Sequence, residues 1–393
     1  MKMFNRRPMK NFRILLLAST ALLTANFALA QTWTQTSALV NYWVGVASSA
    51  DGTKLMAVNG GSSGSIYIST NSGAIWTLTS APGANWAIAA SSADGSKLVA
   101  VVASGGIFTS TNSGATWTQA TNAPSATWTS VASSADGSKL MGTIYNNGIY
   151  ASTNSGVTWT QTSAPTKKWW SVASSADGSK LVATIYTGGI YVSTNSGATW
   201  TQTGAPNKSW TSVASSADGT NLVAVIGGST GSIYTSTNSG ATWTLTSAPS
   251  QNWGNVASSA DGSKLVATGS NGGPIYTSTN TGLTWKSSSV MGNNWGCVAS
   301  SADGGKLVAG DGNAGYIYTA QSTSAPQLKL APTNPDLKLS WLVPSTNFVM
   351  QQSSDLGSWM DMTNTPALNL TNLQNEVILS PTGRSCFYRL KTP

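Results

Sequence analysis

The sequence has 393 residues, of which only 8% are charged, and its formal net charge of +8 comes without a single histidine. The absence of histidine excludes His-based triads, His general bases and most catalytic zinc sites. The two cysteines, Cys297 and Cys386, are too few for a disulfide scaffold, although they leave open one bridge between domains. No cofactor or metal site is expected, because the chain offers single carboxylates and no His or paired-Cys cluster.

Residues 1–30 read as a secretory signal peptide. The segment combines an apolar core, a small-residue pattern ending at Ala30, and five preceding cations, namely Lys2, Arg6, Arg7, Lys10 and Arg13. A transmembrane anchor is the competing interpretation, but the apolar core is short for one. We expect cleavage after Ala30, which leaves a secreted, periplasmic or cell-surface protein without a transmembrane segment. Loss of the five cations lowers the net charge to +3, and residues 31–321 contain no Arg, so nucleic-acid binding is not expected.

From residue 31 to residue 321 one unit recurs seven times. Its Ser-Ser-Ala-Asp-Gly turns recur every 41 to 43 residues and place aspartates at Asp51, Asp94, Asp136, Asp177, Asp218, Asp261 and Asp303. Each copy contains four strand-like runs, which in the third copy are 128–134, 139–144, 148–152 and 159–162. A period near 40 with four strands per copy indicates radial β repeats. We expect Asp-Gly to form a tight hairpin in which both residues have positive φ, and the Lys three residues after most of these aspartates to be a local partner of its own turn.

The two ends of this region complete each other. The segment 33–36 matches a fourth strand without its first three, and the seventh copy stops at Thr319 without a fourth strand. Pairing of these ends removes exposed sheet edges. The sequence therefore predicts an all-β fold, a seven-bladed β-propeller closed by its N-terminal strand. Each first strand opens with a Trp, whose simplest role is a wedge between neighbouring sheets, and a platform on which sugars stack is the alternative. Cys297 lies in a first-strand slot that suits a small buried residue.

A second turn motif recurs in register with the first. The pattern Ser-x-Asn-x-Gly-x-x-Trp occurs at Asn71, Gly73, Trp76; Asn112, Gly114, Trp117; Asn154, Gly156, Trp159; Asn195, Gly197, Trp200; Asn238, Gly240, Trp243; and Asn280, Gly282, Trp285. It resembles the Asp-box of the bacterial neuraminidase repeat, sialidase-like propeller family, with Asn in the Asp position. The side-chain oxygen can accept backbone N–H groups, Gly supplies the required φ and Trp packs beneath. The resemblance implies that these boxes are structural and lie away from the ligand face.

Residues 322–327 are rich in Ser, Thr, Ala and Pro and predict a linker. Residues 328–393 alternate like the strands of a small β-sandwich, with runs at 337–341, 348–353, 359–362, 376–379 and 386–390. The pattern of Phe348, Gln351, Ser353, Leu356 and Trp359 resembles fibronectin-like modules appended to secreted bacterial repeat proteins. Such a module is expected to be a spacer or attachment domain rather than a ligand site.

Catalytic residue types are scarce in the repeats. Seven of the eight acids in 31–321 are the turn aspartates, which leaves Asp311, and the chain's one glutamate is Glu376. Glycosidases need two carboxylates within about 10 Å. A sialidase-like site also needs three arginines and a Tyr/Glu pair, and these cannot be placed here. The protein is therefore expected not to be an enzyme.

With catalysis not expected, ligand binding is the remaining function. We expect it on the face that carries two sets of loops, those that lead into each first strand and those that join second to third strands. The residues of both loop sets vary from copy to copy while the strands repeat, which is typical of binding surfaces. The candidate ligand-binding residues are Trp170, Lys167, Lys168, Lys208, Tyr42, Asn85, Asn252, Asn294 and Asp311. Amides and aromatics suit a sugar, and the lysines suit an anionic glycan or acidic partner.

The sequence thus predicts a secreted, monomeric, non-catalytic protein that binds a protein or polysaccharide. A sialidase-like glycan-processing enzyme and a structural envelope or matrix component are the alternatives.

Overall fold

The computed structural model describes residues 32–291, 294–322, 328–333, 336–342, 349–354, 358–364, 366–371, 373–380 and 387–391. These residues form strands and turns, and no helix among them is long and apolar enough to cross a membrane. The expected signal peptide, Cys386 and most of the expected linker lie outside the described residues.

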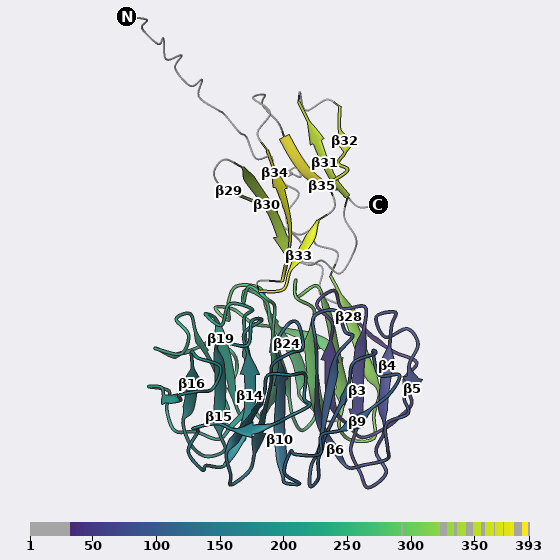
Figure 1. Ribbon diagram of the computed structural model, residues 1–393. Helices are drawn as coiled ribbons and strands as arrows, with labels where there is room; N and C mark the ends of the chain where they lie inside the picture. The colour runs from purple at the N-terminus through teal and green to yellow at the C-terminus, as the bar shows by residue number, and fades with distance from the viewer. Residues whose placement is uncertain are drawn as a thin grey trace, which may run out of the picture.

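Seven four-stranded antiparallel sheets stand around one axis as the blades of a propeller (Figure 1). The first strands are β2 (Trp43–Ser48), β6 (Trp86–Ser91), β10 (Trp128–Ser133), β14 (Trp169–Ser174), β18 (Trp210–Ser215), β22 (Trp253–Ser258) and β26 (Trp295–Ser300). The second strands are β3 (Leu55–Asn59), β7 (Leu98–Val102), β11 (Leu140–Ile144), β15 (Leu181–Ile185), β19 (Leu222–Ile226), β23 (Leu265–Gly269) and β27 (Lys306–Asp311).

The two outer strands of each blade are shorter. The third strands are β4 (Ile66–Ser69), β8 (Ile107–Ser110), β12 (Ile149–Ser152), β16 (Ile190–Ser193), β20 (Ile233–Ser236), β24 (Pro274–Ser278) and β28 (Ile317–Gln321). The fourth strands are β5 (Thr77–Leu78), β9 (Thr118–Gln119), β13 (Thr160–Gln161), β17 (Thr201–Gln202), β21 (Thr244–Leu245), β25 (Lys286–Met291) and, in blade 7, β1 (Trp33–Gln35).

The predicted closure of the ring is confirmed. Strand β1 pairs antiparallel with β28, with Trp33 opposite Ala320 and Gln35 opposite Tyr318. The first strand of blade 1 also packs against the first strand of blade 7. Blade 7 is therefore built from both ends of the repeat region, and every blade has four strands.

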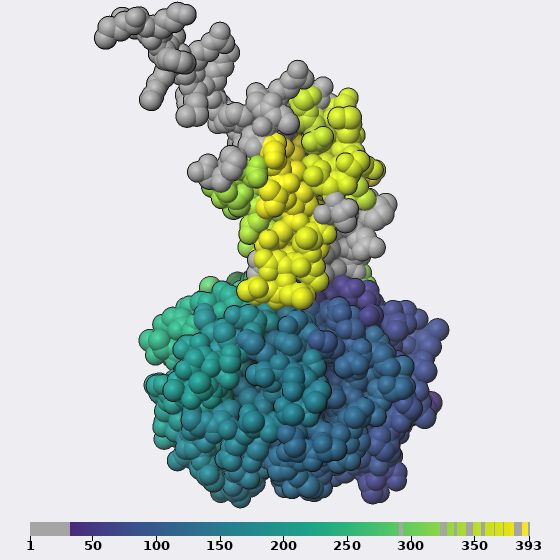
Figure 2. Space-filling model, viewed as in Figure 1, coloured from purple at the N-terminus to yellow at the C-terminus, as the bar shows by residue number. Residues whose placement is uncertain are grey.

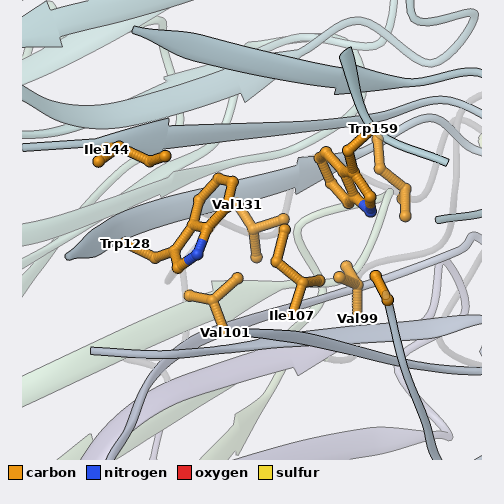
Figure 3. Packing of buried hydrophobic residues seen from close by; sticks show 9 residues of the cluster. Val99, Val101, Ile107, Trp128, Val131, Ile144 and Trp159 are labelled. Atoms are coloured by element: carbon orange, nitrogen blue, oxygen red, sulfur yellow. The ribbon is translucent and has the colours of Figure 1, made fainter. Parts of the chain in front are cut away.

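The seven first-strand tryptophans are wedges between blades, as expected. Each is at most 1% exposed, and each meets the Tyr or Phe of its own third strand nearly edge-on. In Figure 3, Trp128 and Val131 of blade 3 pack against Val99, Val101 and Ile107 of blade 2. This burial between sheets removes the first-strand indoles from any role as a sugar platform.

A closed ring of backbone hydrogen bonds joins the blades at the Ser-Ser-Ala-Asp-Gly turns. The N–H of Ala50 donates to the carbonyl of Ala93 at 2.7 Å, the same bond repeats from blade to blade, and the N–H of Ala302 donates back to Ala50. Methyl side chains suit this position because the seven turns crowd around the axis. We call this side of the propeller, which also carries the Ser-x-Asn-x-Gly turns, the ring face.

Each of these turns is longer than a two-residue hairpin, which corrects the expectation for Asp-Gly. Six residues, 49–54, connect β2 to β3, and only Gly52 has positive φ, at 66°. The Asp51 carboxylate accepts bonds from the Ser49 hydroxyl and the Thr53 N–H, and the Ser49 hydroxyl accepts the Lys54 N–H. The serine and aspartate side chains thus supply the hydrogen bonds that a tighter turn would draw from its backbone.

The turn lysines act across blades rather than within their own turn, so the expected local pairing is wrong for them. The Lys139 ammonium donates to the carbonyl of Asp177 in the next blade at 2.8 Å. Its methylene stem packs so close to Gly178 that a Cβ there would lie 2.7 Å from it. In six of the seven turns the glycine therefore provides both positive φ and room for the lysine of the neighbouring blade, and at Gly262 the neighbouring side chain is Asn221.

The described residues between 328 and 391 form a small two-sheet sandwich, which confirms the expected β-sandwich. One sheet contains β29 (Lys329–Pro332), β30 (Leu337–Leu342), β34 (Gln374–Leu379) and β33 (Ala367–Asn369), and the other contains β32 (Met360–Asp361), β31 (Val349–Ser353) and β35 (Phe387–Lys391). Leu339, Trp341, Met350 and Val377 form the core between the sheets. The short strands β29 and β33 had no clear sequence signal.

The sandwich stands on the ring face (Figures 1 and 2). Its Leu342 and Leu373 pack against the ring alanines, and Leu373 lines a cavity of about 160 Å³ at the mouth of the central channel. The opposite side of the propeller points away from the sandwich.

Candidate binding site on the loop face

The side of the propeller opposite the ring face carries two sets of loops, as the sequence predicted. One set enters the first strands and the other joins second to third strands. Short bridges pair the two sets across blade boundaries, for example Gly64 with Ala84, Asn147 with Lys167 and Gly188 with Lys208. We call this side the loop face.

Every first strand carries a β-bulge just after its Trp, at the edge of the loop face. The register shifts between Trp169 and Ser171 and at the same point in the other six blades. Six blades place a small or β-branched residue in the bulge, namely Val44, Ala87, Thr129, Thr211, Gly254 and Gly296, and blade 4 places Trp170 there. A bulge redirects a side chain, and bulges are frequent next to functional sites.

Trp170 stands between two tyrosines. Its ring centroid lies 5.0 Å from that of Tyr186, at an interplanar angle of 38°, and 6.3 Å from that of Tyr145, nearly edge-on. Both tyrosines begin second-to-third-strand loops, at a position held elsewhere by Gly60, Ala103, Gly227, Ser270 and Gly312. Sequence reasoning missed Tyr145 and Tyr186, although an alignment of the seven copies would have shown both as departures from small residues.

Three exposed lysines lie on the loops next to this aromatic trio of Tyr145, Trp170 and Tyr186. The N–H of Lys167 donates to Asn147, two residues beyond Tyr145, and the carbonyl of Lys168 accepts the N–H of Tyr186. Lys208 pairs through its backbone with Gly188, two residues beyond Tyr186. The four predicted residues Trp170, Lys167, Lys168 and Lys208 therefore lie together, over blades 3 to 5.

The predicted asparagines lie on the loop face but bond to neighbouring loops. The Oδ1 of Asn85 accepts the N–H of Gly61 at 2.9 Å, and that of Asn252 accepts the N–H of Gly228 at 2.6 Å. Asn294 accepts the N–H of Asn271 at 3.4 Å. These amide oxygens hold the loops of the preceding blade.

Asp311 and Tyr42 lie in the blade 7 and blade 1 part of the loop face. Asp311 is 5% exposed, and its carboxylate accepts the N–H of Asn313 at 3.0 Å. Tyr42 is 52% exposed. A substituent on Gly315 would clash with the Asp311 side chain, so this carboxylate fills the inside of its loop.

The turn aspartates all lie on the ring face, where serine hydroxyls hold them. Burial alone would raise the pKa of Asp136, but hydrogen bonds from Ser134, Ser138 and the Ser138 N–H lower it to about 2. The same causes lower the pKa of Asp51, Asp94, Asp177, Asp218 and Asp261. Among the residues that the structure describes, no three acids or cysteines are grouped to hold a metal ion.

Cys297 is buried in its first-strand slot, as expected of a small core residue. Burial raises the pKa of its thiol to about 12, so the thiol stays protonated. A pairing with Cys386 lies outside the described residues.

A second departure from the repeat occurs at the junction of blades 7 and 1. A cavity of about 320 Å³ opens there, whereas equivalent positions at three other junctions hold about 10 Å³ each. Blade 7 has no Ser-x-Asn-x-Gly turn, because its fourth strand comes from β1. This cavity lies where the two ends of the repeat region meet, in a blade that lacks the turn. The aromatic trio, in contrast, departs from the repeat through its side chains. We therefore place the candidate site at the trio.

The fold and its free loop face define the class: the chain is a seven-bladed β-propeller. No family model and no curated protein matches the sequence. Among solved structures it is similar to YCF48 from Cyanidioschyzon merolae, at 14% identity and a TM-score of 0.58, over 74% of this chain and 98% of that one. It is also similar to YCF48 bound to D1 peptide, at 15% identity and a TM-score of 0.56, over 75% and 97%. At such identities the likeness shows the fold alone.

Proposed function

We propose that this propeller is a non-catalytic binding protein that holds a protein partner on its loop face. The observation that carries the proposal is the departure from the repeat at Tyr145, Trp170 and Tyr186, flanked by Lys167, Lys168 and Lys208. Five blades have small or β-branched residues at both of these positions, while blades 3 and 4 together supply a large aromatic cluster flanked by positive charge. Side-chain variation on a constant scaffold is typical of binding sites, and aromatic residues dominate binding energy at interfaces.

The chemistry of the loop face supports binding over turnover. Its one acid among the described residues, Asp311, is buried within its own loop. The turn aspartates lie on the other side of the propeller, bonded to serines. Neither a general acid and base pair nor an activated nucleophile is therefore available beside the trio.

The type of partner follows from the trio's geometry and from a neighbour. Tyr186 partly covers one side of the Trp170 indole, which reduces the flat surface that a sugar would stack on. A propeller of the same fold, YCF48, is known with a bound D1 peptide. Both points favour a polypeptide over a polysaccharide as the ligand of this chain.

The remaining expectations belong to the same proposal. We propose that residues 1–30 direct export, that the Asn-containing turns relate this chain to Asp-box propellers, and that the C-terminal sandwich is a fibronectin-like spacer or attachment module. The protein then acts as a monomer outside the cytoplasm. N-terminal sequencing of the fractionated, expressed protein tests export directly, and an uncleaved cytoplasmic product would contradict it.

A peptide selection tests the main proposal. The purified protein is used to select from a displayed random-peptide library, and selected synthetic peptides are titrated against the protein and its Trp170→Ala variant. We expect at least about a tenfold loss of affinity, the size of an aromatic anchor. Selected peptides that bind both proteins equally, or the absence of any selected peptide, would contradict the proposal. Turnover of a fluorogenic glycoside panel that Asp311→Asn abolishes would favour the enzyme instead.

A further inference from the structure

A second unusual surface lies on the loop face, at the junction of blades 7 and 1. Leu39 is 66% exposed, Val40 50%, Tyr42 52% and Tyr316 37%. The other six loops into first strands carry Pro, Gly, Ser, Thr, Asn, Gln or Lys at most of these positions. We call these four residues the seam patch.

Backbone pairing brings the seam patch together from two distant segments. Asn41 and Gly315 exchange two backbone hydrogen bonds of 3.0 and 3.1 Å, which sets Tyr316 beside the loop of Val40 and Tyr42. The indole N–H of Trp43 also donates to Gly315, at 3.2 Å. The exposed apolar side chains therefore stand on a rigid base, and exposed apolar clusters of this kind mark interaction sites.

The seam patch and the aromatic trio lie on opposite sides of the propeller axis. The seam patch occupies the loops of blades 7 and 1, and the trio those of blades 3 and 4, which are three blades further around a ring of seven. The two sites differ in charge, because Lys167, Lys168 and Lys208 flank the trio and no lysine lies in the seam patch. A ligand that contacts both sites must extend across the loop face from one side of the axis to the other.

We propose that the loop face binds one extended polypeptide segment, with apolar residues on the seam patch and acidic residues beside the trio. This inference rests on the proposed function and adds the chemistry and polarity of the ligand. Carboxylates of the segment face the three lysines, which are the only cations on the described loop face, while aliphatic side chains cover Leu39 and Val40. Polypeptides supply aliphatic and acidic groups within one chain.

Other ligands match only one of the two sites. A nucleic acid needs a broader cationic surface than three lysines in one sector. An acidic glycan would meet the lysines but leave the aliphatic side chains of the seam patch exposed. A second copy of this chain would cover the apolar residues of the seam patch. It would not offer free carboxylates to the three lysines, because its ring-face aspartates already accept hydrogen bonds from serines.

Tethered synthetic peptides test the inference on the full chain. One block of three Asp and one block of Leu-Tyr-Leu are joined by Gly-Ser spacers of 4, 8, 12 and 16 residues, and each block is also tested alone. Binding is followed by fluorescence anisotropy in low salt. If one segment spans both sites, affinity rises at least about tenfold over the better single block and passes through an optimum in spacer length.

Paired variants assign each block to its site. Lys167→Glu with Lys168→Glu is expected to reduce the joined peptide to the affinity of the apolar block alone, and Leu39→Ser with Val40→Ser to that of the acidic block alone. Lys286→Glu and Leu283→Ser are the matched controls, because both side chains are exposed, Leu283 at 71%, and neither lies on the loop face. Melting curves confirm that each variant is folded.

The outcomes separate this inference from the proposed function. If the single blocks bind and respond to the loop-face variants but the joined peptide binds no more tightly than the better block, the inference of one segment spanning both sites is overturned. The proposed binding function would still stand. Peptides insensitive to every loop-face variant would overturn both. Sialylated or sulfated glycans that bind through the lysines while no peptide does, or self-association lost in Leu39→Ser with Val40→Ser, would replace the segment by a glycan or a second copy.

Discussion

The two faces of this propeller use the same seven repeats in opposite ways. On the ring face the Ser-Ser-Ala-Asp-Gly turn is identical in all seven copies, and its backbone closes a ring of hydrogen bonds from Ala50 through Ala302. On the loop face the residues after each first-strand Trp change from blade to blade. A position fixed by its neighbours on both sides keeps its residue type in all seven copies, whereas a position in contact with solvent is free to differ.

This contrast separates residues of the frame from residues of the site even when they are adjacent. Trp169 is fully buried between blades 3 and 4, while Trp170, the next residue, projects from the bulge toward two tyrosines. The exceptions to the repeat therefore mark the candidate binding site. Four changes, ordered by expected effect on stability, test how far this separation holds.

The largest effect is expected from the adjacent tryptophans. Trp169→Ala removes a fully buried indole and is expected to lower the free energy of unfolding by about 3–5 kcal/mol. Trp170→Ala should cost about 1 kcal/mol or less, because it removes a partly exposed side chain, yet it should abolish most peptide binding. Denaturant titration of both variants measures the difference. Equal destabilisation would show that Trp170 belongs to the frame.

The next effect concerns the glycine of a ring-face turn. Gly219 has φ of 68°, and a Cβ there would lie 2.7 Å from the Lys180 side chain. Gly219→Val is expected to cost about 2–4 kcal/mol through backbone strain and this clash. Gly204→Val is the control, since nothing lies within 4 Å of its Cβ position and its φ is not positive. Melting temperatures that fall equally in both variants would contradict this account.

Acid should weaken the ring face next. The folded-state pKa of Asp136 is about 2, below its ordinary value of 3.8. A lowered folded pKa contributes stability that is complete above pH of about 4 and is lost as the pH falls toward 2. Thermal melts from pH 7 to pH 2 should show this loss, and Asp136→Asn should make it smaller. An unchanged pH dependence in the variant would argue against the hydrogen-bonded carboxylate.

The smallest effect is expected from a contact between blades. Lys139→Ala removes one hydrogen bond to the Asp177 carbonyl and the stem that covers Gly178. Because the ammonium group is largely solvated, we expect a loss of about 1 kcal/mol or less. Lys286→Ala serves as the comparison in the same denaturant titration. A loss as large as that of Gly219→Val would mean that the lysines hold the ring together.

Most of the frame could be predicted from the sequence because its constraints are local or periodic. The four runs of the third copy match β10 to β13 within two residues at each end, and the pairing of β1 with β28 follows from one copy lacking what the other end supplies. The alanine ring could not be predicted. Its hydrogen bonds join backbone atoms of different blades, so no pattern of side chains in the sequence indicates them.

The candidate site was predictable only in part, for a physical reason. Trp170 was singled out because an extra Trp interrupts a regular pattern. Tyr145 and Tyr186 were missed because they become significant only when two neighbouring blades bring them to one indole. The amides of Asn85 and Asn252 look like ligand groups in a sequence, yet the nearest unpaired backbone N–H groups of the neighbouring loops use them first.

The closing strand also determines when this fold can be completed. Strand β1 is synthesised first, but its partner β28 comes almost 300 residues later, a delay of roughly 15–60 s at ordinary translation rates. Until then blades 1 to 6 can form only as an open array, and the nascent segment around β1 must remain unpaired. Its mostly polar sequence, Thr-Trp-Thr-Gln-Thr-Ser, exposes little apolar surface and therefore limits aggregation with other chains while it is unpaired. Ring closure is therefore the last step in the folding of the propeller during synthesis. Slow translation would delay the pairing of β1 with β28, and truncation before β28 would prevent it.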